Sequence, residues 1–208
     1  MTVPFSPRAF LRDRQALLVH FSTVMARRPE LTFPDDLRQA ATLQGVPLAF
    51  STIQIGDTNP HGSGRGGAEG SVGMLVDIGP GTIIQSVSHQ DSGSNEQGSL
   101  GFEPSEENCA SSIDQRVTSN EWHVQDYLPV GLFILPPIFV RRVVDIGGAP
   151  TPVEVLLQVP ETVEPFPGVR VFTTNAEKFL ELDRPSGEWL AVSYDEIIPN
   201  ADDACLKI

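Results

Sequence analysis

Lysine and cysteine are scarce in this chain of 208 residues. The lysines are Lys178 and Lys207, against twelve arginines, which leaves few candidates for Schiff-base or lysine-nucleophile chemistry. The cysteines are Cys109 and Cys205, which form neither a Cys-x-x-Cys motif nor a zinc-binding spacing. The spacing allows a disulfide between them but does not require one, and we expect free thiols in a reducing compartment.

Basic residues are also fewer than acidic ones, and the formal net charge is −13. Residues 1–44 carry six arginines against four acidic residues, residues 45–144 carry four against eleven, and residues 145–208 carry four basic residues against twelve acidic ones. Such a surface repels phosphate backbones and anionic lipid headgroups, so we expect no binding to nucleic acid or to membranes. The acidic excess favours solubility, and it would also suit a cationic partner.

A long hydrophobic run is missing as well. The most apolar stretch, residues 130–140, contains Gly131, Pro136 and Pro137 and is too short to span a bilayer as a helix. Residues 1–15 do not show the charged segment followed by an apolar segment that marks a signal peptide. We therefore expect a soluble, cytoplasmic protein.

The N-terminal part, residues 1–44, is predicted to be helical. Ser6 before Pro7 is typical of a helix start, because the hydroxyl caps the first turn and the missing N–H of proline costs nothing there. Apolar residues at positions 10, 11, 17, 18, 21, 24 and 25 then mark one face of a single helix that ends before Pro29. A second helix is predicted over Pro34–Leu43.

Short β-favouring runs separated by Pro- and Gly-rich turns dominate after Gly45, and one late helix is predicted to start at Thr174 or Asn175. Because helices come first and strands follow without regular alternation, the predicted fold class is α+β. It consists of an N-terminal helical pair followed by a largely antiparallel β-sheet system with long Gly/Ser-rich loops. We expect a single domain over residues 1–208, with its β-rich part over 45–208. The predicted strands are Leu48–Ile55, Ser71–Ile78, Thr82–Ser88, His123–Tyr127, Gly131–Leu135, Ile138–Val144, Val153–Val159, Val169–Thr173 and Trp189–Tyr194.

Two long polar segments, residues 56–70 and 91–112, fit no helix or strand pattern. Twelve of the eighteen glycines lie between positions 56 and 101. Structureless segments of this length inside a compact domain are usually either functional or disordered. The leading hypothesis is therefore a soluble binding module, which recognises a protein or a small-molecule partner with a surface formed by these two loops.

His89 and Asp91 follow the predicted strand over residues 82–88. Because they are two positions apart, an extended backbone would place both side chains on the same side. Together with a later histidine, His123, they would supply the three protein ligands of a 2-His-1-carboxylate site for a divalent metal. The same run also fits a polar turn in which the Asp91 side chain bonds backbone N–H groups.

Glu121 and His123 flank Trp122 at the head of another predicted strand. Strand alternation would place the acid and the histidine on one face, where they could form a catalytic acid/base pair. The competing interpretation is a strand start with a solvent-facing acid and a core aromatic. An enzyme whose site gathers His89, Asp91, Glu121 and His123, with or without a metal, is therefore the alternative to the binding module.

Ser51 and Thr52 lie at the beginning of the β-rich part, and Glu121 follows much later. A strand with Ser-Thr followed by a glutamate resembles the core of the ADP-ribosyltransferases. The resemblance implies a transferase that uses Ser51, Thr52 and Glu121. That family also has an arginine or histidine on an earlier strand, whereas the early histidine of this chain, His20, falls within the predicted N-terminal helix.

Overall fold

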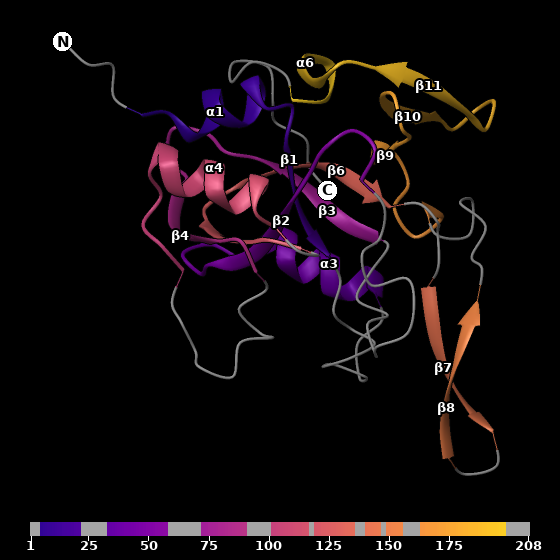
Figure 1. Ribbon diagram of the computed structural model, residues 1–208. Helices are drawn as coiled ribbons and strands as arrows, with labels where there is room; N and C mark the ends of the chain where they lie inside the picture. The colour runs from indigo at the N-terminus through magenta and orange to yellow at the C-terminus, as the bar shows by residue number, and fades with distance from the viewer. Residues whose placement is uncertain are drawn as a thin grey trace.

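The computed structural model describes residues 5–21, 33–57, 72–90, 101–116, 119–135, 140–146, 149–155 and 163–198. Within these ranges the chain forms four short helices and a mostly antiparallel sheet, which makes the fold α+β with a sheet-rich core (Figure 1). None of these helices is long and apolar enough to cross a membrane. The helices are α1 (Pro7–Asp13), α3 (Phe33–Thr42), α4 (Glu106–Asp114) and α6 (Tyr194–Ile197).

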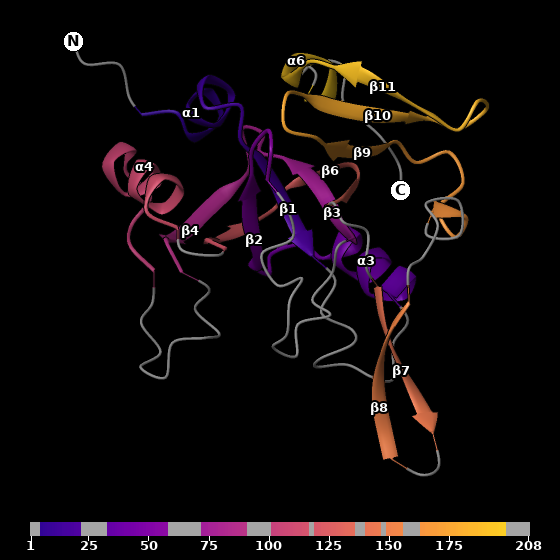
Figure 2. The same cartoon turned by 45° about the vertical axis from the view of Figure 1, so that its right-hand side comes forward.

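The main sheet of the described residues has nine strands in the order β11-β10-β9-β6-β3-β1-β2-β5-β4. Neighbouring strands are antiparallel, except for the parallel pair β6 and β9. The strands are β1 (Leu17–Phe21), β2 (Leu48–Ile53), β3 (Val72–Asp77), β4 (Ile83–Ser88), β5 (Glu121–Gln125), β6 (Leu128–Ile134), β9 (Val171–Thr174), β10 (Phe179–Asp183) and β11 (Glu188–Val192). Two further strands, β7 (Val140–Ile146) and β8 (Ala149–Val155), pair with each other in a hairpin that extends away from this sheet (Figure 2).

The single long N-terminal helix of the sequence prediction is wrong from residue 14 onward. Helix α1 begins where Ser6 and Pro7 predicted, but Gln15 adopts a left-handed conformation with φ of 49° and the chain continues as β1. Leu17, Leu18 and Val19 are all buried, so this strand is covered on both faces. A strand of that kind has a continuous apolar run, which sequence alone cannot separate from the apolar face of a helix. The predicted continuation through residues 22–32 lies outside the described residues.

Three other elements test the sequence prediction. The second helix is confirmed, since Phe33–Thr42 forms α3. The late helix after Thr174 is wrong, because Phe179–Asp183 forms β10 in a hairpin with β11. The second half of the predicted loop over 91–112 is helical instead: Ser105 caps α4 and accepts a hydrogen bond from the backbone N–H of Asn108 at 3.2 Å.

The sheet is apolar on both faces over most of its width. One face, which carries Leu18, Phe50 and Trp122, packs in the same hydrophobic cluster as residues of α3 and α4. The other face carries Val19 and Phe133 and packs with residues of α6. Toward β2, β5 and β4 this second face changes from apolar to polar side chains, and that change locates the candidate site.

Candidate functional site

Strand pairing brings polar side chains from three strands together on the second face of the sheet. Ser86 of β4 lies opposite His123 of β5, and Ser88 lies opposite Glu121. The pairing of β2 with β5 places Ala49 opposite His123 and Phe50 opposite Trp122, so the next residue, Ser51, lies beside Glu121. Because cross-strand partners share a face, these side chains form one surface. We call it the polar face; its members are Ser51, Ser86, Ser88, Glu121 and His123.

His123 makes a hydrogen bond from each of its ring nitrogens. Nε2 lies 2.7 Å from Oε1 of Glu121, and Nδ1 lies 2.9 Å from Oγ of Ser86. The side chain of Glu121 is 10% exposed and that of His123 is 32% exposed. The hydrogen bond to Glu121 raises the pKa of His123, against the opposing effect of burial. The acid and the histidine that the sequence placed on one face are thus in direct contact, and a serine completes the row.

The contacts fix what the imidazole can do in its neutral form. In the neutral imidazole, Nε2–H donates a hydrogen bond to the carboxylate of Glu121, which leaves Nδ1 as an acceptor for the hydroxyl of Ser86. An acid that orients a histidine, and a histidine that accepts the proton of a hydroxyl, are the components of nucleophilic catalysis by serine. The arrangement therefore has the connectivity needed to deprotonate Ser86.

An irregularity in β4 puts Ser86 in this position. Ile84 lies opposite Val124, yet the next cross-strand pair joins Ser86 to His123, so Gln85 is an extra residue in β4. Without this bulge, Gln85 rather than Ser86 would lie opposite His123. Bulges of this kind change the direction of side chains and are common near active sites. Sequence analysis did not identify Ser86, because a bulge changes the register without leaving a distinctive residue pattern.

A buried amide joins β2 and β5, two of the three strands that carry the polar face. Asn120, next to Glu121 in the chain, accepts a hydrogen bond from the backbone N–H of Thr52 at 2.8 Å. Its Nδ2 lies 2.6 Å from Oγ1 of Thr52 and 3.0 Å from the carbonyl oxygen of Ser112. Because Thr52 follows Ser51, this amide fixes the backbone beside both Ser51 and Glu121.

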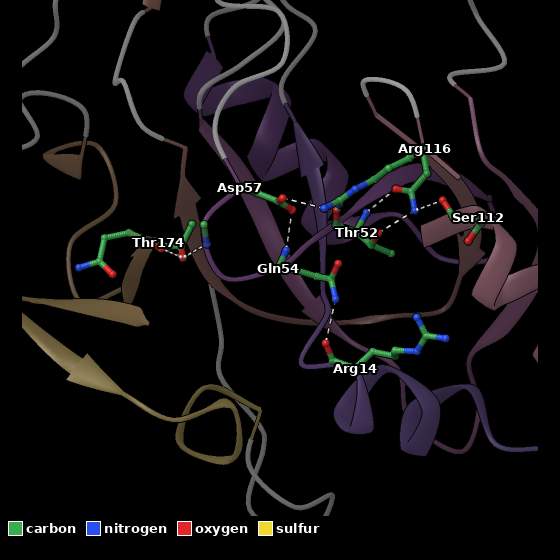
Figure 3. A network of polar contacts seen from close by, with 10 residues as sticks. Arg14, Thr52, Gln54, Asp57, Ser112, Arg116 and Thr174 are labelled. Atoms are coloured by element: carbon green, nitrogen blue, oxygen red, sulfur yellow. Dashed lines mark hydrogen bonds and ion pairs between the residues drawn. The ribbon is translucent and has the colours of Figure 1, made fainter. Parts of the chain in front are cut away.

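Arg116, just after α4, extends the same network to the end of β2 (Figure 3). Its guanidinium donates to the carbonyl oxygen of Thr52 at 2.7 Å and to Oδ1 of Asp57 at 2.6 Å. Asp57 also accepts from the backbone N–H of Gln54 at 2.7 Å, and the Gln54 side chain donates to the carbonyl oxygen of Arg14 at 3.0 Å. These bonds connect the segment after α1, the end of β2 and the segment after α4, so they fix the end of the strand that carries Ser51.

The residues proposed as metal ligands are only partly described. His89 follows β4, and its ring stacks on Phe102, with ring centroids 6.5 Å apart and planes inclined by 18°. Asp91 lies outside the described residues, as do residues 58–70 and 91–100 of the two loops proposed for binding. Among the residues whose positions are given, no cluster of three or more His, Cys, Asp or Glu side chains could hold a metal ion. A divalent metal at His89, Asp91 and His123 stays a prediction.

His20 lies on a strand, not on a helix as the sequence predicted. It belongs to β1, and its Nδ1 lies 2.8 Å from the carbonyl oxygen of Ala49 in β2. The strands that carry His20, Ser51 and Glu121 are therefore consecutive in the sheet, in the order β1-β2-β5. Ser51 and Glu121 share the polar face, whereas the His20 ring lies against Phe50 on the opposite face, 5.6 Å between centroids.

Comparison of the chain with protein-family models, with curated proteins and with solved structures finds no match. The case for a function therefore depends on the polar face itself.

Proposed function

We propose that three residues of the polar face form the active site of an enzyme that cleaves an acyl bond, with Ser86 as nucleophile, His123 as general base and Glu121 as the acid that orients it. The observation that carries the proposal is the unbroken row of hydrogen bonds from Glu121 through His123 to Ser86. The two nitrogens of His123 have the reverse roles of those in the serine proteases, where Nε2 contacts the serine. The triad is defined by connectivity rather than by which nitrogen is used, so this reversal preserves the chemistry.

The reaction follows from the two hydrogen bonds. As Oγ of Ser86 attacks the carbonyl carbon of an ester or thioester, its proton moves to Nδ1 of His123, and Glu121 stabilises the imidazolium that forms. The bond to the leaving group then breaks, and His123 donates the proton to that group. Water attacks the resulting acyl-enzyme while His123 accepts a proton from it. The bond from the acyl carbon to Oγ of Ser86 then breaks, His123 donates the proton to Oγ, and the acid is released.

The environment of the pair supports this role. Glu121 is nearly buried, which strengthens its hydrogen bond to His123, while His123 remains partly open to an incoming substrate. Catalysis needs the neutral imidazole, and Glu121 raises the pKa of His123. We therefore expect kcat/KM to rise with pH, with an apparent pKa above the ordinary value for histidine of about 6.5.

Labelling with a fluorophosphonate probe tests the proposal. The probe reacts with activated serine hydroxyls, so the wild-type protein should be labelled at Ser86, as located by peptide mass spectrometry. Ser88→Ala is the matched control, because Ser88 lies on the same strand and face but does not contact His123 in this row. Labelling should persist in this control and disappear in Ser86→Ala and His123→Asn. Equal labelling of wild type and Ser86→Ala would refute the assignment, as would a folded wild-type protein that takes up no probe.

A second candidate, ADP-ribosyl transfer, is favoured by the position of Ser51 beside Glu121 on the polar face. The family has a histidine or arginine on a strand that precedes the Ser-Thr strand. His20 lies on such a strand, β1, but its ring is on the opposite face of the sheet. In this reaction Glu121 would stabilise the positive charge that develops on ribose as nicotinamide leaves NAD⁺, with Ser51 beside it. Release of nicotinamide from NAD⁺ separates the two candidates. It should be lost in Glu121→Gln and Ser51→Ala but kept in Ser86→Ala, whereas acyl cleavage has the opposite dependence on Ser51 and Ser86.

A further inference from the structure

A cavity of about 340 Å³ lies between the start of α1, the turn from β3 to β4 and the segment before α4. Most of its lining is apolar and comes from Pro7, Ile78, Pro80, Ile84 and Pro104. Ile78 belongs to the hydrophobic cluster that contains Phe50 and Trp122, and Ile84 packs against that cluster, so the cavity is on the sheet face opposite the polar face. Its volume is within the range of about 300–1,000 Å³ that is common for small-molecule sites.

Bonds within the protein hold the walls of this cavity. The hydroxyl of Thr82 accepts from the backbone N–H of Gly79 at 2.9 Å and donates to the carbonyl oxygen of Asp126 at 2.9 Å, which fixes the turn between β3 and β4. The rings of Pro7 and Pro80 restrict the backbone further. The cavity is therefore formed before any ligand binds, which reduces the entropy that binding must overcome.

Of the described residues that line the cavity, Arg8 alone carries a charge. Its guanidinium donates to both carboxylate oxygens of Asp77, at 3.0 and 2.6 Å, which joins α1 to the end of β3. The side chain of Asp77 is 3% exposed and is not part of the lining, whereas that of Arg8 is 25% exposed and is. A molecule in the cavity thus meets positive charge beside apolar walls, in a chain whose net charge is −13.

We infer that this cavity binds a small carboxylate with an apolar body. The carboxylate would accept hydrogen bonds from Arg8, and such charge-assisted bonds are about twice as strong as neutral ones. The body would pack against the proline and isoleucine side chains, and burial of its surface would add to the affinity. Since a water molecule occupies about 30 Å³ in the liquid, the cavity has room for about eleven atoms of that size, which suits 3-phenylpropionate. The inference does not depend on the proposed acyl cleavage, because Ser86 lies on the other face of the sheet.

Titration of the full chain with 3-phenylpropionate, followed by NMR of labelled isoleucine methyl groups, tests the inference. The methyl signals of Ile78 and Ile84 should shift and saturate, with a Kd of about 1 mM or below. Ile83 is the control within the chain, because it is next to Ile84 but is 50% exposed and does not line the cavity, so its signal should stay in place. 3-Phenylpropylamine, which has the same body and the opposite charge, should bind at least about tenfold more weakly.

A pair of double variants tests the contribution of Arg8. Arg8→Met combined with Asp77→Asn removes both charges, so that neither is left buried alone, and should weaken binding of the carboxylate at least about tenfold. Arg12→Met combined with Asp195→Asn is the matched control. It removes an ion pair of 2.9 Å from the same helix, but Arg12 does not line the cavity, so binding should equal that of wild type.

Three results would overturn the inference. They are the absence of saturable shifts at Ile78 and Ile84, equal affinity for the carboxylate and the amine, and unchanged binding by a folded Arg8→Met, Asp77→Asn protein. If that double variant does not fold, the comparison of the two ligands on wild type still decides.

Discussion

Replacement of Asn120 by alanine should destabilise the chain strongly, because this side chain is 1% exposed and bonds three groups. It accepts from the N–H of Thr52 and donates to the Thr52 hydroxyl and to the carbonyl of Ser112. A typical intramolecular hydrogen bond contributes about 0.5–1.5 kcal/mol net, and a buried group left without its partner costs about 1–3 kcal/mol. Since three partners lose a bond at once, we expect Asn120→Ala to lower the free energy of unfolding by about 3–4 kcal/mol.

Equilibrium unfolding in urea measures this loss. The midpoint should fall while the slope of free energy against urea stays constant, because the surface exposed on unfolding hardly changes. Gln125→Ala is the control: its bond to Gln85 is exposed, and we expect a change of about 0.5 kcal/mol or less. A loss below about 1 kcal/mol for Asn120→Ala, at constant slope, would refute the argument that this amide holds β2 and β5 together.

Three further changes have defined outcomes. In Glu121→Gln, His123 loses the carboxylate that raises its pKa. The stability that this pair adds to the wild type is complete below about pH 6.5 and is lost as the pH rises through the raised pKa of His123. The difference in melting temperature between wild type and variant should therefore be larger at about pH 6 than at about pH 9. Gly73→Ala should cost about 3 kcal/mol in urea unfolding, because its Cβ would lie 2.7 Å from the His20 carbonyl oxygen in the centre of the sheet. Arg8→Ala should cost about 3 kcal/mol in the same measurement, because it leaves the carboxylate of Asp77, 4% exposed, without the guanidinium that bonds both of its oxygens. A cost below about 1 kcal/mol in either variant would contradict the packing or ion-pair argument.

Sequence predicted the sheet better than the helices, for a physical reason. Most strands of this fold are short β-rich runs bounded by Gly and Pro, and the predicted Leu48–Ile55, for instance, covers β2. The error in β1 has the opposite cause, since a strand buried on both faces has no alternation to detect. The missed helix α4 did carry a signal, a capping serine followed by Glu106 and Glu107 in the first turn, but the polar surroundings favoured a loop.

Only two members of the candidate site, Glu121 and His123, could be predicted from the sequence. Glu121 and His123 are two positions apart, so any strand assignment puts them together, and their contact needs no knowledge of other strands. Ser86 and Ser51 come from strands 37 and 70 residues away from their partners. Their positions depend on strand order and on the extra residue Gln85, neither of which leaves a local pattern.

The composition of the second sheet face argues that the polar row is there for chemistry. Along the same face the residues Val19, Leu75 and Phe133 are fully buried and apolar, as stability favours. Glu121 continues this face with an acidic side chain that is 10% exposed, although withdrawing a charge from water costs several kcal/mol. Apolar residues at this position would stabilise the sheet, and departures from the stable choice concentrate at functional sites. The carboxylate of Glu121 bonds Nε2 of His123, whose side chain is 32% exposed and so can still contact an incoming molecule, which a purely structural ion pair would not require.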